Sequence, residues 1–295
     1  MTTIKVNGKN YPSTIVENSS ESLDGKMQTP LLLSFPHSGE NYPDDFSTNP
    51  DLDFNVLDFP NDKYVNKLYM ERNNLNLASI HANFPRSYID VNRHQHNIDV
   101  NMLKDGDSWY GRIHPAGLET GTTLFWSKTK EVFEIYSRKL SHNELKQRLA
   151  KCFVPYHQLM TYHIQRMHQT HGKAFILDCH SMTQFDGKKR GRKQRPQIDI
   201  GDRNGQGCSL EYSEFVADTF SGLGYDVTIN GRFVGGEIIL RYGWPEINQH
   251  ILQIEIRRDL YMDEDTRERN ENFTKMQQDC SSALREIKTF VDKKI

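Results

Sequence analysis

Two apolar runs in this chain each lead into a histidine followed by a serine. The run Leu31–Phe35 leads to His37, and the run Ala174–Leu177 leads to His180. Such runs are typical of buried strands, and side chains at the carboxyl ends of strands in an α/β sheet point into the crevice where ligands bind. We therefore expect an α/β fold in which both histidines reach the same crevice.

A carboxylate close to the first histidine completes a metal-ligand set, because Glu40 lies three residues after His37. Two histidines and one carboxylate are the usual protein ligands of a catalytic zinc ion, which keeps a fourth position open for water. The pattern predicts a metal-dependent hydrolase whose zinc is held by His37, Glu40 and His180. Asp62, near the start of an expected helix, is a competing third ligand, although aspartate at such a place is often only a helix N-cap.

A further carboxylate stands inside an apolar strand. The segment His250–Ile256 alternates in a way that places Glu255 on the face opposite His250. A carboxylate this deep in a strand must be paired, hydrogen-bonded or protonated. We interpret Glu255 as the general base that takes a proton from the attacking water. The alternative is a structural ion pair with Arg257 or Arg93.

Three arginines are candidates for binding an acidic substrate or a developing oxyanion. Arg93 follows an expected strand over residues 87–91, and Arg232 lies in a glycine-flanked loop. A guanidinium group binds a carboxylate through two parallel N–H bonds. We expect Arg93 and Arg232 to bind substrate carboxylates, and Arg86 or Arg93 to stabilise the oxyanion.

A basic run over residues 188–195 raises the alternative of a scaffold or nucleic-acid-binding protein. The whole chain, however, has 37 Lys and Arg against 39 Asp and Glu, which gives a formal net charge of −2. This balance argues against a general polyanion-binding role, and the run has no interleaved aromatic residues to stack on bases. We interpret the run as a solvated loop and do not expect nucleic acid as a partner.

The hydrophobic pattern indicates a polar N-terminal arm or edge hairpin over residues 1–28 and a single domain over residues 29–295. The stretch 94–125 has no clear period and is interpreted as an active-site loop. Strands are expected over residues 31–35, 75–82, 87–91, 174–181, 197–201, 226–230 and 250–256, and helices over 62–73, 144–171, 211–221 and 265–290.

Sequence features also bear on the compartment. No apolar run approaches the roughly 20 residues of a membrane span, and the N-terminal residues lack an apolar signal segment, so a cytoplasmic protein without membrane attachment is expected. The four cysteines form no close pair, which favours a reducing compartment over a disulfide framework. Cys179 is expected to face away from the crevice, because neighbours on a strand point to opposite faces.

A series of short motifs resembles the N-formylglutamate amidohydrolases of histidine degradation. The motifs stand in the family's order over roughly residues 30–265, so the series is specific although each motif alone is weak. They are Pro36–Gly39 with Tyr42-Pro43, Asp62 through Tyr69, Arg86–Arg93, Asp178–Met182, Ile200–Asp202 through Cys208, Asn230–Gly236, Tyr242-Gly243 with Pro245, and His250 through Met262.

The resemblance implies a zinc-dependent amidohydrolase that cleaves the N-formyl or N-acyl group from a small acidic amino acid, such as N-formyl-L-glutamate. The family is similar in turn to the zinc carboxypeptidases, which implies a compact α/β fold with a mixed central sheet and helices on both faces. One zinc ion per chain is implied, and other divalent transition metals accept the same ligands. A carboxypeptidase-like peptidase or deacylase acting on another N-acyl amino acid or short peptide is the alternative function.

The resemblance also implies residue roles. Asn92 with Arg93 is similar to the carboxypeptidase carboxylate-binding pair, and Glu255 is similar to the catalytic glutamate. For the metal carboxylate, Glu40 matches the carboxypeptidase HxxE pattern, whereas Asp62 matches the formylglutamate hydrolases, so both stay candidates. Two further residues are candidates for positioning the substrate, namely Tyr242 and His250.

Overall fold

The computed structural model describes residues 3–6, 9–12, 15–22, 25–105, 109, 117–129, 133–186 and 193–293. Contacts divide the chain into two compact units. The first unit comprises residues 1–16, 36–63 and 81–160, and the second unit comprises residues 17–35, 64–80 and 161–295.

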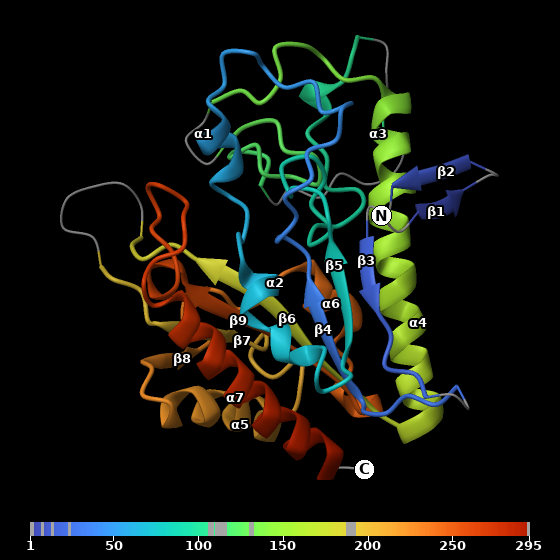
Figure 1. The fold of residues 1–295 in the computed structure, drawn as a ribbon. Coiled ribbons are helices and arrows are strands. Elements are labelled where there is room, and N and C mark those ends of the chain that lie inside the picture. The colour runs from blue at the N-terminus through green and yellow to red at the C-terminus, as the bar shows by residue number, and fades with distance from the viewer. Residues whose placement is uncertain are drawn as a thin grey trace. The chain divides into compact units, whose positions relative to one another are not determined.

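A mixed sheet of seven strands lies almost entirely in the second unit (Figure 1). Its strands are β3 (Ile15–Asn18), β4 (Leu31–Phe35), β5 (Ala78–Ala82), β6 (Ala174–Met182), β7 (Ile198–Gly201), β8 (Val227–Ile229) and β9 (Gln249–Arg257). They lie in the order β3-β5-β4-β6-β9-β7-β8. Strands β4, β6 and β9 are parallel neighbours, whereas β7 is antiparallel to β9 and parallel to β8. The predicted mixed central sheet is confirmed.

Helices cover both faces of this sheet, as predicted. The helices are α1 (Phe54–Asp58), α2 (Val65–Leu68), α3 (His142–Arg148), α4 (Val154–His171), α5 (Leu210–Gly222), α6 (Glu237–Tyr242) and α7 (Phe273–Lys293). Helices α2, α5 and α7 share one buried apolar cluster with the strands. Helix α6 contacts β9, and Figure 1 shows it behind the sheet, with α2 and α7 in front.

Apolar and polar residues alternate along the strands. One face of the sheet is therefore apolar, and the opposite face carries a group of polar side chains. The apolar cluster under α2, α5 and α7 includes Leu33, Phe35, Leu177, Cys179, Leu252, Ile254 and Ile256. The intervening positions hold buried polar side chains, namely Ser34, Asp178, His180, Gln253 and Glu255. Cys179 therefore faces away from His180, as predicted. The sheet thus collects its polar groups on one face.

Several predicted elements differ from the observed ones because side chains compete with regular backbone bonding. Residues 87–91, predicted as a strand, form turns instead. The Asp90 carboxylate accepts a bond from the Asn92 amide, and the Arg93 amide donates to the Asp90 carbonyl. Such local bonds replace a strand ladder. The predicted strand was therefore wrong, and a turn presents Asn92 and Arg93 instead.

The predicted helix over residues 144–171 is present but is divided. Helix α3 begins with a capping box between Ser141 and Glu144, and a π-helical turn over Leu149–Phe153 separates α3 from α4. Gly172 follows α4 with φ +71°, which is the predicted end. The predicted helix over residues 62–73 contains only α2 and a 3₁₀ turn, and its N-cap is Tyr64 rather than Asp62.

An N-terminal arm or edge hairpin and two long loops were predicted, and the described residues bear on each of them. Strands β1 (Thr3–Val6) and β2 (Lys9–Pro12) pair as an antiparallel hairpin, while β3 joins the large sheet at its edge. The division into an arm and a single domain stays a prediction. In the basic run, residues 188–192 lie outside the described part of the chain. The described part of the stretch 94–125 contains one 3₁₀ turn, Val100–Met102, and no other helix or strand.

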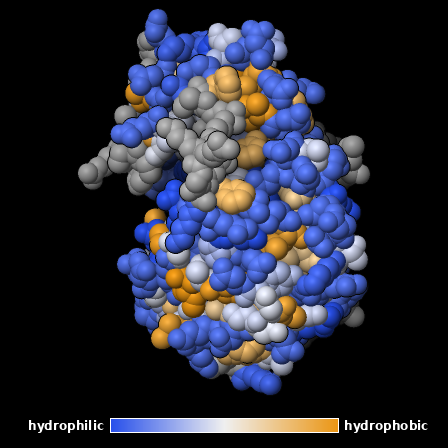
Figure 2. Space-filling model, turned by 90° about the vertical axis from the view of Figure 1, so that its left-hand side faces the viewer, coloured by the Kyte–Doolittle hydropathy of each residue, from blue (hydrophilic) through white to orange (hydrophobic). Residues whose placement is uncertain are grey.

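All four cysteines are buried free thiols, so no disulfide framework is present. Burial raises the pKa of each thiol. Among the described helices, none combines the length and apolarity of a membrane span. Figure 2 shows hydrophobic residues as separate small patches on the hydrophilic face in view.

Candidate metal centre

In the first unit, His37 and Asp62 face each other in a buried environment. The His37 Nδ1 atom lies 3.4 Å from Asp62 Oδ2, and each residue is 1% exposed. The Asp62 amide donates to the His37 carbonyl at 2.9 Å, which fixes the two backbones together. Two ligands of a tetrahedral zinc, each about 2.0–2.1 Å from the ion, are about 3.3 Å apart. The observed separation therefore fits two ligands of one metal ion.

The other ring nitrogen of His37 has a carboxylate partner. Nε2 lies 2.7 Å from Oδ1 of Asp90, which is fully buried. A neutral His37 that donates its Nε2–H to Asp90 carries a lone pair at Nδ1, on the side of Asp62. Metal-bound histidines usually have this arrangement, in which the distal N–H is donated to a carboxylate.

Arg86 holds the second oxygen of Asp90. Its Nε and Nη2 atoms donate to Asp90 Oδ2 at 3.2 and 2.8 Å, and its guanidinium lies over the Trp126 ring at 5.1 Å. Burial by itself raises the Asp90 pKa, but the charges of Arg86 and Arg93 and the hydrogen bond with His37 outweigh it and hold that pKa well below its usual value. Asp90 is therefore an anion beside His37.

The two candidate carboxylates differ in position. Asp62 is buried beside His37, whereas the Glu40 side chain is exposed. Gly39 lies so close to Phe84 that an added Cβ would come within 2.3 Å of its carbonyl oxygen. The backbone of this turn thus packs tightly against residues 83–84. The geometry of the first unit brings Asp62, and not Glu40, to His37 Nδ1.

The turn after Asp90 carries Asn92 and Arg93. The Arg93 guanidinium donates to the carbonyls of Thr122 and Asn92 at 3.0 and 3.1 Å. These bonds to backbone groups hold the guanidinium in one orientation. Arg93 also adds positive charge near Asp90, since it contributes to the lowered pKa of that residue.

In the second unit, His180 repeats the arrangement of His37. Its Nε2 lies 2.9 Å from Asp178 Oδ2, and the Ser34 hydroxyl donates to Asp178 Oδ1 at 2.7 Å. Asp178 and His180 share a face because they are two positions apart on β6. Both histidines thus contact a carboxylate through Nε2, which leaves Nδ1 as the ring nitrogen suited to binding a metal ion. Neither aspartate was assigned a role from the sequence, although both lie in the family motifs and the i, i+2 spacing could have identified Asp178 as a partner of His180.

Glu255 lies beside His180 in the sheet. The two residues are register partners on the parallel strands β6 and β9. Gln253 Nε2 donates to Glu255 Oε1 at 2.7 Å, and both side chains are buried. Arg257, the structural partner considered for Glu255, instead pairs with Asp259 at 2.7 Å. The second unit thus places a carboxylate and a histidine next to each other on the polar face.

Asp199, which the sequence analysis missed, holds the loop that carries Arg232. Its two oxygens accept the amides of Gly231, Arg232 and Phe233 at 3.0, 2.7 and 2.9 Å. Asp199 is also the register partner of Glu255 on the neighbouring strand. The Arg232 side chain is 64% exposed and lies 3.6 Å from Asp186. The loop backbone is therefore fixed to β7, the strand next to Glu255, while the exposed Arg232 guanidinium lies near Asp186.

Two predicted substrate-binding residues lie at the other end of β9. His250 stacks on Phe175, its Nδ1 accepts the Ser209 amide, and burial lowers its pKa. The Tyr242 carbonyl accepts a bond from Gln249, and burial raises the pKa of its hydroxyl to about 12. Within the second unit, neither residue is brought to Glu255.

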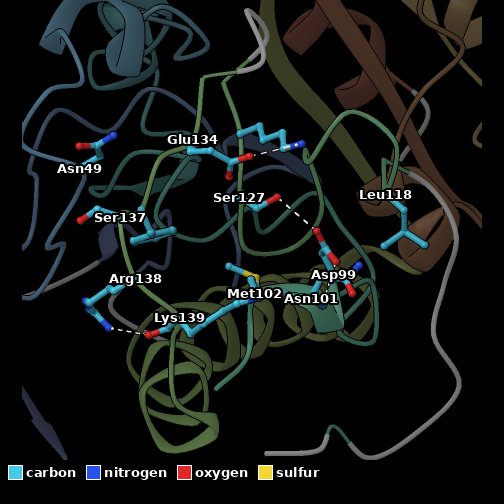
Figure 3. A pocket seen from close by; sticks show the side chains of 12 residues that line it. Asn49, Asp99, Asn101, Met102, Leu118, Ser127, Glu134, Ser137, Arg138 and Lys139 are labelled. Carbon is cyan, nitrogen blue, oxygen red and sulfur yellow. Dashed lines mark hydrogen bonds and ion pairs between the residues drawn. The ribbon is translucent and has the colours of Figure 1, made fainter. Parts of the chain in front are cut away.

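A cavity of about 710 Å³ lies in the first unit (Figure 3). Lys128 pairs with Glu134 across 3.4 Å there, and the Ser127 hydroxyl donates to Asp99. None of the predicted site residues is among its lining residues, which are Asn49, Asp99, Asn101, Met102, Leu118, Ser127, Lys128, Glu134, Tyr136, Ser137, Arg138 and Lys139. We assign the cavity no role.

Comparison with known proteins adds a family context to this geometry. The family model described as N-formylglutamate amidohydrolase matches residues 29–262. An N-formylglutamate deformylase of Pseudomonas putida is 30% identical over 242 residues, covering 80% of this chain and 82% of the relative. An N-formylglutamate deformylase of Pseudomonas aeruginosa is 26% identical over 248 residues, covering 80% of this chain and 84% of the relative. The crystal structure of an N-formylglutamate amidohydrolase from Ralstonia eutropha JMP134 has a TM-score of 0.87 at 30% identity, covering 96% of this chain and 100% of that one.

Proposed function

The chain belongs to the N-formylglutamate amidohydrolase family, and we propose that it hydrolyses N-formyl-L-glutamate to formate and L-glutamate. It is a hydrolase that acts on a linear amide bond. The observation that carries the proposal is the buried pair of His37 and Asp62, whose ligand atoms have the separation of two zinc ligands, in a chain of this family.

We propose that His37, Asp62 and His180 hold one zinc ion, each with one nitrogen or oxygen atom. Chain connectivity supports this set. Ser34 and Asp178 are register partners on the parallel strands β4 and β6. His37 comes three residues after Ser34, and His180 comes two residues after Asp178. Both histidines therefore follow paired positions at the carboxyl ends of neighbouring strands. When bound, zinc lowers the pKa of its water toward ~7 and withdraws charge from the substrate carbonyl.

Glu255 is proposed as the proton carrier of the reaction. Its carboxylate takes a proton from the water that attacks the formyl carbon, and it returns that proton to the nitrogen of glutamate when the C–N bond breaks. The bond from Gln253 fixes one carboxylate oxygen of Glu255, so the other oxygen has a defined direction. The register pairing with His180 supports this role, because it sets the base next to a metal ligand.

The acidic substrate needs cationic partners. We propose that Arg93, with Asn92, binds one carboxylate of N-formyl-L-glutamate and that Arg232 binds the other. The backbone bonds of Arg93 and the Asp199-held loop of Arg232 support these assignments, since both pre-position the guanidinium. The two bonds from Arg86 to Asp90 support Arg93 rather than Arg86 as the arginine that contacts the substrate.

Metal content and hydrolysis measured on the same preparation test the proposal. We expect about one zinc per chain, formate release from N-formyl-L-glutamate, and loss of both after chelation with recovery on adding zinc. A panel of other N-acyl amino acids and dipeptides in the same assay identifies the substrate class. Zinc with activity only on another member of the panel would overturn the proposed substrate.

The Glu255→Gln variant tests the proton carrier. We expect kcat to fall by roughly 10²–10⁴-fold while one zinc stays bound, because the substitution keeps the shape and the bond from Gln253. Near-normal turnover of this variant would contradict the role of Glu255. The matched control is Glu264→Gln, a carboxylate that binds the Gln184 amide, for which we expect little change in kcat.

A further inference from the structure

Asp90 is bonded both to a proposed metal ligand and to the proposed substrate-binding turn. We propose that Asp90 is a positioning residue that orients His37 and the Asn92–Arg93 turn together, and that Arg86 acts through Asp90. The inference rests on the proposed function, because it takes His37 as a ligand and Arg93 as a substrate contact. It predicts that zinc affinity and substrate affinity are linked through this one carboxylate.

A single oxygen makes the link. Oδ1 of Asp90 accepts His37 Nε2 at 2.7 Å and the Asn92 amide at 2.9 Å. The Arg93 amide donates to the carbonyl of the same aspartate at 3.1 Å. A displacement of this carboxylate therefore moves the imidazole and the turn at once. Asp90 is fully buried, so water does not replace a lost bond easily.

Arg86 fixes the carboxylate from the opposite side. Its two N–H bonds to Oδ2 leave Oδ1 directed at His37 and Asn92. The Arg86 amide in turn donates to the Asn61 side chain at 3.2 Å, next to Asp62 in sequence. The planar guanidinium presents two N–H groups at a fixed angle to this one oxygen, which the single ammonium of a lysine does not reproduce. Arg86 is thus a positioning residue rather than a direct contact of the substrate.

Asp178 in the second unit provides a matched comparison. It binds His180 Nε2 as Asp90 binds His37 Nε2, but its other oxygen accepts the Ser34 hydroxyl on β4. Its contacts link it to the sheet and not to a turn with substrate-binding residues. Loss of Asp178 is therefore expected to affect the metal and not the binding of the substrate.

Zinc titration of metal-free protein, followed by kinetics at saturating zinc, tests the inference. For Asp90→Asn we expect zinc affinity to fall about 10–100-fold and KM for N-formyl-L-glutamate to rise about tenfold at saturating zinc. For Asp178→Asn we expect a similar loss of zinc affinity and a lower kcat with KM within about twofold of the parent. A weaker zinc affinity of Asp90→Asn without any rise in KM would overturn the link.

A second variant and a spectroscopic measurement guard against misfolding of Asp90→Asn. Arg86→Lys keeps the positive charge. We expect its zinc affinity to fall and its KM for N-formyl-L-glutamate to rise together, each by about three- to tenfold. In metal-free protein with ¹⁵N-labelled histidine, we expect His37 as the Nε2–H tautomer in the parent and a tautomer mixture in both variants. An unchanged KM and tautomer in Arg86→Lys would overturn the inference. A parent protein that binds no zinc and hydrolyses no substrate would instead overturn the proposed function, while the His37 tautomer would still report the Asp90 contact.

Discussion

At the scale of single residues, burial separates groups that have the same chemistry. Asp62 is buried against His37 Nδ1, while Glu40 is exposed to solvent although it has the shorter spacing from the same histidine. A buried carboxylate beside a lone pair needs a cation to offset its charge. An exposed carboxylate is solvated by water and has no such need.

Substitution of the two carboxylates provides a direct test. We expect Asp62→Asn to lower the zinc affinity of metal-free protein by about 100-fold or more, because it removes an anionic ligand. Glu40→Gln, the matched control, should stay within about twofold of the parent. Competition for zinc with a chromophoric chelator measures both. The opposite order of the two effects would mean that Glu40 is the ligand.

Residues that stand at recognisable places in a strand could be identified from the sequence. His37 and His180 follow apolar runs, and Glu255 interrupts one, so the strand pattern alone singled them out. The contacts of Asp90 could not be predicted, because they depend on a turn where a strand was expected. The position of His250 on the opposite face followed from alternation, but its separation from Glu255 along the strand was not used.

At the scale of elements, one side chain determines the position of a whole loop. Asp199 on β7 accepts three consecutive amides of the loop after β8, as well as the Thr228 hydroxyl at 2.9 Å. A Cβ on Gly231 would lie 2.7 Å from Thr228 Oγ1 and 3.1 Å from Asp199 Oδ1, so glycine is required for this close approach. Strand β7 therefore sets where the Arg232 guanidinium is presented.

Removing this anchor is expected to weaken substrate binding. Asp199→Asn replaces one accepting oxygen with an N–H₂ group that faces backbone amides, so we expect KM to rise about tenfold and the free energy of unfolding to fall by about 1–3 kcal/mol. Thr228→Val removes only one bond to Asp199 and should change KM by less than threefold. Steady-state kinetics and urea unfolding measure both variants. An unchanged KM in Asp199→Asn would show that the loop is not part of substrate binding.

Helix α3 offers a pH-dependent test at the same scale. Burial by itself raises the Glu144 pKa, but bonds and charge from Arg138 outweigh it, and the pKa is lowered. A carboxyl whose folded pKa is depressed stabilises the fold above its unfolded pKa of about 4.3 and loses that contribution as pH falls through the folded value. Glu144→Gln keeps the capping box, so we expect its free energy of unfolding to lie about 0.5–1 kcal/mol below that of the parent at pH 7, and this difference to shrink as pH falls below about 4.3.

The capping serine is the control for this test. Ser141→Ala removes the bond that Ser141 Oγ accepts from the Glu144 amide, at a cost of about 1 kcal/mol. Because a hydroxyl does not titrate in this range, we expect the loss in the free energy of unfolding of Ser141→Ala to be similar at pH 7 and pH 3. Urea unfolding at both pH values measures the two variants. A Glu144→Gln deficit that persists at low pH would show that the charge does not contribute.

Helices and strands with a clear apolar pattern were predicted, whereas turns that depend on a particular side-chain contact were not. The strands β4, β6 and β9 were expected within one residue of their observed bounds, and the end of α4 was expected where it is observed, since the apolar pattern marks each of them directly. The turn after residue 90 depends on the hydrogen bond between the Asp90 side chain and the Asn92 amide, and the π-helical turn over Leu149–Phe153 interrupts a continuous helical pattern. The periodicity of hydrophobic residues does not predict hydrogen bonds between a side chain and the backbone of a turn.

At the scale of the whole molecule, the proposed metal has a thermodynamic consequence. A ligand that binds only the folded state adds RT ln(1 + [L]/Kd) to stability, which is about 2.7 kcal/mol at 100 times Kd. We expect added zinc to raise the Tm of metal-free protein by roughly 5 °C. His180→Gln should remove most of this shift. An equal shift in the parent and in His180→Gln would mean that zinc stabilises the protein from another site.

The buried cysteines have a practical consequence for the chain as a whole. Cys152 lies in the first unit, whereas Cys179 on β6, Cys208 before α5 and Cys280 on α7 lie in the second. Protonated, buried thiols react with alkylating reagents only after the surrounding core opens. The alkylation rate of each cysteine, followed by mass spectrometry, therefore reports the opening of each unit separately, without any introduced label.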